Sequence, residues 1–81
     1  MRDLEVIRQI ESVMAEEDEL YRRAEGVHHF TPTDRERLHE LQAHLDQCWD
    51  LLRQRRARRE FGEDPDQARV RPVDVVEHYQ G

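Results

Sequence analysis

The fold is decided by TDRERLHELQAHLDQCWDLLRQRRARREF, residues 33–61, a stretch that no Gly or Pro interrupts. Its apolar side chains recur at steps of three and four, which is the spacing of one helical face. Thr33 followed by Glu36 has the form of a capping box. The stretch therefore predicts one helix over about residues 34–60, roughly 40 Å long. Its apolar arc of about 160° is wider than one partner helix covers.

A second amphipathic helix is predicted over residues 3–25, where the apolar side chains fall within an arc of about 140°. Asp3 suits its N-cap, and Gly26 suits the position just past its end. Residues 26–33 contain Gly and Pro and have no helical periodicity, so they form a loop between antiparallel helices. The core of this hairpin is predicted from nine positions: Ile7, Ile10, Met14, Leu38, Leu41, Leu45, Cys48, Trp49 and Leu52.

Glu17 interrupts the apolar arc of the first helix, where an unpaired carboxylate would be costly to bury. Two interpretations remain open. Either the side chain reaches water at the seam between the helices, or it meets His44, which flanks the facing side of the second helix.

The tail, residues 61–81, predicts two short elements. Asp64 can cap a helical turn that begins at Pro65, and Pro72 can begin another. Val73, Val76 and Tyr79 would share one side of that second helix, although three valines in PVDVVEHY would also suit a strand. We favour the helix. The prediction is a single all-α domain over residues 1–81, with the tail packed back on the second helix.

Composition limits the functions that this chain can have. Its 81 residues carry 13 basic and 19 acidic side chains, and the net charge of −6 argues against general nucleic-acid affinity. The single cysteine, Cys48, allows no internal disulfide and suits a reducing cytoplasm. The charged N-terminus predicts neither a signal peptide nor a membrane span. A core this small would gain from self-association.

Two charge clusters stand out, and they lie toward opposite ends of the predicted hairpin. The basic cluster comprises Arg53, Arg55, Arg56, Arg58 and Arg59; the acidic cluster comprises Glu16, Glu17 and Asp18. They cannot neutralise each other within one hairpin. Two hairpins packed antiparallel would bring each cluster against its opposite and could form a four-helix bundle. Within the helix, Arg56 with Glu60 and Arg59 with Glu63 have the i,i+4 spacing of ion pairs.

The segment LDQCWDLLRQRRARREFGEDPDQARVRPVDVVEHYQ, residues 45–80, resembles the small actinobacterial proteins grouped as DUF2630, a domain of unknown function. Residues 1–32 resemble that family more loosely. The resemblance implies that the end of the second helix and the tail belong to one unit. It implies no activity, catalytic residue or cofactor.

Catalytic and metal-binding patterns are scarce. Glu36 and His39 have the spacing of a bundle metal pair, but they project away from the leucine face, and Cys48 lies on that face without an activating cation. We expect no enzyme activity, no cofactor, no metal and no small-molecule substrate. Two hypotheses remain: a protein-interaction or self-assembling helical module, and an RNA-binding or ribosome-associated protein that uses the basic cluster.

Overall fold

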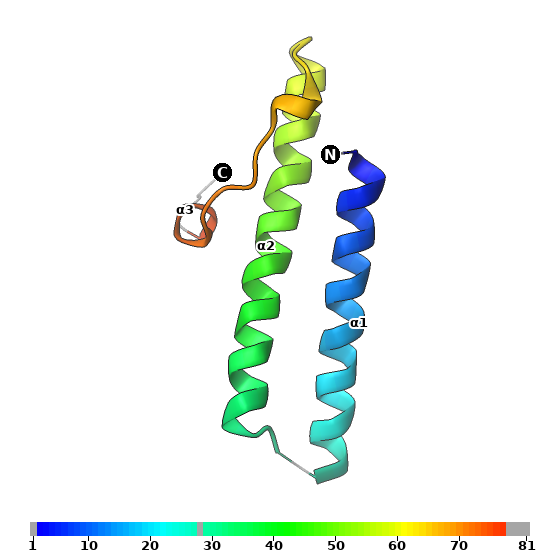
Figure 1. Cartoon of the computed structure of the whole chain (residues 1–81), viewed down its shortest axis with the longest axis vertical. Helices are drawn as coiled ribbons and strands as arrows, with labels where there is room; N and C mark the ends of the chain where they lie inside the picture. The colour runs from blue at the N-terminus through cyan, green and yellow to red at the C-terminus, as the bar shows by residue number, and fades with distance from the viewer. Residues whose placement is uncertain (1, 28, 78–81) are drawn as a thin grey trace.

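The computed structural model describes residues 2–27 and 29–77 and confirms an all-α chain. Two long helices, α1 (Asp3–Val27) and α2 (Pro32–Glu60), run antiparallel as a hairpin (Figure 1). A single 3-10 turn, η1 (Pro65–Gln67), and a short helix, α3 (Val73–Glu77), follow and both contact α2. Figure 1 shows the tail returning along α2 on the side away from α1. The described residues include no strand.

Helix α2 begins earlier than predicted, because a different threonine caps it. The hydroxyl of Thr31 accepts a hydrogen bond from the backbone N–H of Asp34 at 3.1 Å. The Asp34 carboxylate in turn accepts one from the backbone N–H of Thr31 at 3.4 Å. Pro32 occupies the first helical position, where its fixed φ suits the helix and no N–H is needed. The capping box predicted at Thr33 and Glu36 is therefore wrong.

The glycines near the ends of the two long helices, Gly26 and Gly62, behave differently. Gly62 has a φ of 73°, in the left-handed region, just beyond the end of α2. Its backbone N–H donates to the carbonyl of Arg59 at 3.2 Å, and the N–H of Glu63 donates to the carbonyl of Arg58 at 2.7 Å. Gly26, in contrast, lies inside the last turn of α1, so the first helix runs further than predicted.

The core between α1 and α2 consists of two clusters of buried side chains. One contains Val6, Ile10, Cys48 and Leu51; the other contains Val13, Leu20 and Leu41. Leu38, Leu45 and Leu52, also predicted for the core, are only half-buried and pack on the edges of these clusters.

Three residues predicted for the core lie outside it. Ile7, Met14 and Trp49 are 40%, 50% and 47% exposed. The apolar arcs of α1 and α2 are wider than the contact that each helix offers the other, so one flank of each stays open. The tail does not cover this flank, because it is held on another side of α2.

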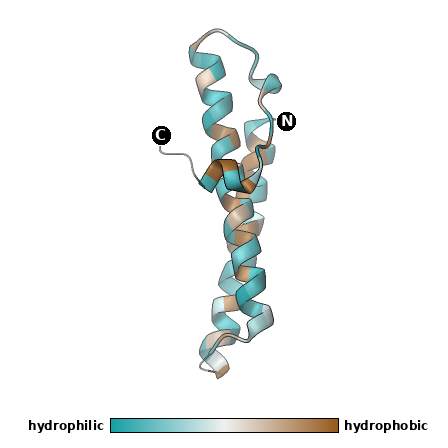
Figure 2. Cartoon of the chain, turned by 90° about the vertical axis from the view of Figure 1, so that its left-hand side faces the viewer, coloured by the Kyte–Doolittle hydropathy of each residue, from teal (hydrophilic) through white to brown (hydrophobic). Residues whose placement is uncertain are grey.

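The tail forms the helix rather than the strand. Asp64 caps η1, its carboxylate accepting a hydrogen bond from the backbone N–H of Asp66 at 2.9 Å. In α3, Val76 is buried and Val73 is half-buried, while Tyr79 lies outside the described residues. Figure 2 shows α3 lying across α2 and carrying hydrophobic segments. Within the described residues, no helix has the length and apolar character needed to cross a bilayer.

Candidate interaction surface

Asp50 is the buried polar centre that joins the tail to α2. Its side chain is fully buried, and the guanidinium of Arg71 binds both carboxylate oxygens, with Nε donating to Oδ2 at 2.9 Å. The amide of Gln54 donates to the same Oδ2 at 2.9 Å. Hydrogen bonds from Arg71 lower the pKa of Asp50 below its ordinary value of 3.8, although burial opposes this. Asp50 is therefore a charged, satisfied anchor.

Two glutamines on either side of Asp50 hold the tail backbone. The Gln47 amide donates to the carbonyl of Arg71 at 3.0 Å, and the Gln54 amide donates to the carbonyl of Arg69 at 2.7 Å. Positions 47, 50 and 54 share one side of a helix. We call these three side chains, with the tail groups they bind, the tail clasp.

A second ion-pair group joins the start of α1, the end of α2 and η1. The Arg55 guanidinium is almost fully buried and donates to Asp3 at 2.5 Å and to Asp66 at 3.0 Å. Arg59 also donates to Asp3, at 3.1 Å. Hydrogen bonds from Arg55 and Arg59 lower the pKa of Asp3, and those from Arg55 lower the pKa of Asp66. Arg55 therefore serves the fold rather than an exposed patch.

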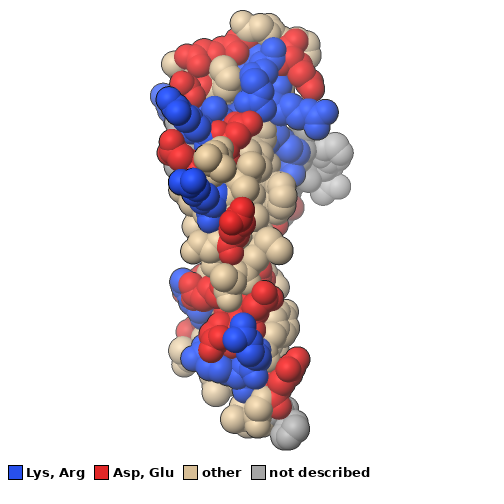
Figure 3. Space-filling model, turned by 90° about the vertical axis from the view of Figure 1, so that its right-hand side faces the viewer, with Lys and Arg blue, Asp and Glu red and all other residues tan. Residues whose placement is uncertain are grey.

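The rest of the basic cluster is also engaged within the chain. Arg56 pairs with Glu60 at 3.1 Å, as its spacing predicted. Glu63 pairs with Arg58 at 3.6 Å and not with Arg59, because the chain turns at Gly62. Arg53 approaches Asp50 at 3.9 Å. Figure 3 shows acidic and basic side chains interspersed over the α1 side of the molecule rather than separated into blocks.

The acidic cluster is divided as well. Glu16 binds the Arg37 guanidinium of α2 through two hydrogen bonds, at 2.5 and 2.9 Å, and these lower the pKa of Glu16. Glu17 is half-buried and, within the described residues, makes no hydrogen bond or ion pair with His44. Asp18 is exposed. Beside Glu17, an ion pair therefore crosses the seam from Glu16 to Arg37, one residue from the position considered in the sequence.

An apolar surface extends along one side of the hairpin. We call it the apolar face; it comprises Ile7, Met14, Tyr21, Leu38, Leu45, Leu52 and Trp49. On α1, Ile7, Met14 and Tyr21 form a row at steps of seven, and on α2, Leu38, Leu45 and Leu52 form another. Each row drifts by only about 20° per repeat along its helix. Seen along each helix from its N-terminus, each row is rotated in the same direction, by about 40–100°, from the buried apolar side chains of that helix. In an antiparallel pair, equal rotations point to the same side.

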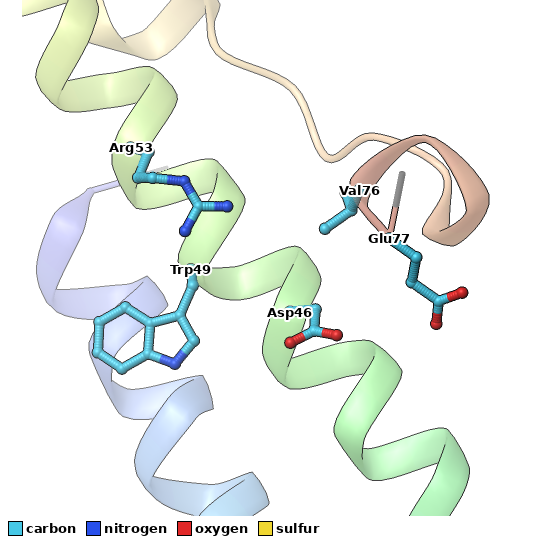
Figure 4. Close-up of a pocket in the computed structure, with 5 residues that line it drawn as sticks. All are labelled: Asp46, Trp49, Arg53, Val76 and Glu77. Carbon is cyan, nitrogen blue, oxygen red and sulfur yellow. The ribbon is translucent and has the colours of Figure 1, made fainter. Parts of the chain in front are cut away.

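The ends of the apolar face are marked by aromatic residues. Near the loop, Tyr21 is 46% exposed and packs edge-on against Phe30, with ring centroids 5.3 Å apart. Near the tail, Trp49 lines an open hollow of about 320 Å³ together with Asp46, Arg53, Val76 and Glu77. In Figure 4 the Trp49 ring and α3 extend from opposite sides of α2. The hollow combines charged and apolar walls.

Cys48 is a buried thiol on the core side of α2. Burial raises the pKa of the Cys48 thiol, which donates to the Gln9 side chain at 3.8 Å. Among the described residues, no three His, Cys, Asp or Glu side chains gather as a metal site.

Comparison with known proteins places the chain in a family. The sequence pattern of the family described as "Protein of unknown function (DUF2630)" matches residues 2–81. The chain belongs to this family. Uncharacterized proteins of Mycobacterium bovis and Mycobacterium tuberculosis are 43% identical over 79 residues, which cover 98% of this chain and 91% of each relative. The match therefore includes the first helix as well as the C-terminal half. No solved structure matches the chain.

The sequence did not reveal the tail clasp. Asp50 lies on the side of α2 opposite the leucines, so periodicity marks it as solvent-facing. The available signal was the spacing of Gln47, Asp50 and Gln54, which lie on one side of the helix. Their side chains can bind backbone groups or a guanidinium. Arg71, two residues before α3, completes the tail clasp.

Proposed function

We propose that this protein is a non-enzymatic helical interaction module that self-associates, two hairpins pairing through their apolar faces into a four-helix bundle. The observation that carries the proposal is the apolar face, where Ile7, Met14, Tyr21 and Trp49 are each at least 40% exposed. Large side chains left open at regular spacing are typical of helix faces that bury themselves against another helix.

The shape of the chain supports this proposal. Its extents are 51 × 25 × 15 Å and its radius of gyration is 15.2 Å. A compact domain of this length would have a radius of gyration of about 12 Å. The hairpin is one layer thick, whereas stable domains are built from at least two packed layers. A second hairpin on the apolar face would supply the missing layer.

The driving force in this proposal is apolar burial rather than opposed charge blocks. Glu16 is bound to Arg37, and Arg55 and Arg59 are bound to Asp3. These charges would have to leave partners in their own chain before they could meet the clusters of another. The charge clusters therefore no longer support two hairpins that run antiparallel to each other, the arrangement expected from the sequence.

Sedimentation at micromolar concentration tests the proposal. One chain has a mass of 9.8 kDa, and we expect the wild type to sediment at twice that mass. Ile7→Glu and Trp49→Glu should each yield monomers, because a buried unpaired carboxylate opposes association. Phe61→Glu is the matched control, since Phe61 is 80% exposed but lies beyond the face. A monomeric wild type, with circular dichroism showing an intact helical fold, contradicts the proposal.

RNA binding through the basic cluster receives less support, because all five guanidinium groups lie beside carboxylates of their own chain. An RNA titration that shows salt-sensitive binding, lost in Arg56→Glu, would promote this alternative. We place the protein in the cytoplasm, where a single thiol such as Cys48 stays reduced.

A further inference from the structure

The core clusters fix how α1 and α2 are aligned along the hairpin. Leu41 packs with both Val13 and Leu20, so it is level with the middle of the segment between them. Counting along antiparallel helices from that point, Trp49 is level with Ile7 to within about one turn. The same count makes Gln42 level with Met14.

The outer rims of the apolar face carry opposite charges. On α1, the next row at steps of seven starts at Leu4 and continues with three exposed carboxylates, Glu11, Asp18 and Glu25. On α2, the row that contains Trp49 continues at the same step to Arg35 and Arg56, both exposed. Within the described residues, the three carboxylates and Arg35 are in no ion pair.

We infer that a second copy of this chain covers the apolar face in one arrangement, with α1 of each copy packed against α2 of the other. This inference rests on the proposed self-association and specifies its geometry. At equal heights, Ile7 meets the partner's Trp49 and Met14 meets the partner's Gln42. Every neighbouring pair of helices in the resulting bundle is antiparallel, which is a common bundle geometry.

Charge selects this arrangement over the alternative in which like helices face each other. Pairing α1 with α1 would align two acidic rows, and like charges held side by side disfavour an interface. Pairing α1 with the partner's α2 places Arg35 at a height between Asp18 and Glu25. The rim charges then complement each other along the edges of the face.

Engineered cysteines distinguish the two arrangements. In a Cys48→Ala background, chains carrying Met14→Cys and chains carrying Gln42→Cys are oxidised alone and as a mixture, with a size tag on one chain. We expect a disulfide only in the mixture, because each new thiol faces the other type of helix. Met14→Cys chains that link to each other efficiently would overturn the arrangement while leaving self-association intact.

A charge exchange provides a second readout on the otherwise unmodified chain. Arg35→Glu should weaken the dimer about tenfold, and adding Asp18→Arg with Glu25→Arg should restore most of the affinity. If the wild type dimerises and Arg35→Glu dimerises with the same affinity, the arrangement is overturned. If the wild type stays monomeric and the engineered cysteine chains form no disulfide in any mixture, both the arrangement and the proposed function are overturned.

Discussion

At the residue scale, Asp50 controls how the tail is held. Its carboxylate is fully buried and is bound by Arg71 and Gln54. Asp50→Asn keeps the shape but removes the charge that Arg71 needs, so we expect the free energy of unfolding to fall by about 1–3 kcal/mol. Urea denaturation measures this change. Asp46→Asn, at an exposed position one turn away, should change stability by less than about 0.5 kcal/mol. Equal losses would show that Asp50 is no anchor.

The same residue makes stability depend on acid. Because the folded pKa of Asp50 is lowered, the unfolded chain binds the proton more readily. This contribution to stability is complete above the ordinary pKa of 3.8 and is lost as the pH falls through the lower folded value. We expect the free energy of unfolding to decline below about pH 5, and less steeply in Asp50→Asn than in the wild type. Identical slopes would contradict the assignment.

Single residues were the least predictable part of the structure. Periodicity shows which side of a helix is apolar, and it therefore marks Asp50 as a surface residue. Arg55 has the direction of the leucines before it, but as a charged member of the basic cluster it was expected to be exposed. Both are buried because distant segments, at Arg71 and at Asp3 and Asp66, fold over them. A tertiary ion pair has no local spacing in the sequence, so only the folded chain reveals it.

At the scale of the element, the N-terminus of α2 tests the capping analysis. Thr31→Ala removes the side chain that accepts the N–H of Asp34 and should cost about 0.5–2 kcal/mol. Thr33→Ala, inside the first turn and exposed, should cost only a few tenths of a kcal/mol. Thermal or urea unfolding of both variants distinguishes the positions. A larger loss from Thr33→Ala would favour the cap expected from the sequence.

The two glycines should respond to alanine with opposite signs. Gly62 has a positive φ, which alanine adopts at a cost of about 1–2 kcal/mol. Gly26 is helical with open space around its Cβ position, so Gly26→Ala should stabilise the chain by up to about 1 kcal/mol. The difference in melting temperature between the two variants measures this contrast. Destabilisation by Gly26→Ala would mean that α1 ends before that residue.

The elements themselves were well predicted because their signals are local. Steps of three and four define both long helices, and Pro72 begins α3 as expected. The starting point of α2 was missed because two threonines compete for the cap. Thr31 prevails because it leaves Pro32 at the first helical position, where proline is favoured.

At the scale of the whole molecule, the hairpin explains which core predictions failed. Ile7, Met14 and Trp49 share the apolar stripes of their helices, so sequence periodicity cannot separate them from buried neighbours. The separation arises from the topology: α1 takes one side of α2, the tail takes another, and the flank with Trp49 receives neither. In the proposed dimer these residues would be buried after all.

That proposal predicts how the melting temperature responds to protein concentration. A partner that binds only the folded chain stabilises it by mass action, by about 2.7 kcal/mol at 100 times the dissociation constant. Raising the concentration of the wild type a hundredfold should therefore raise its melting temperature by several degrees. Trp49→Glu should melt at a temperature independent of concentration, because a carboxylate on the face prevents pairing, whereas Phe61→Glu should follow the wild type. Calorimetry across this range would contradict self-association if the wild type and Trp49→Glu were equally insensitive.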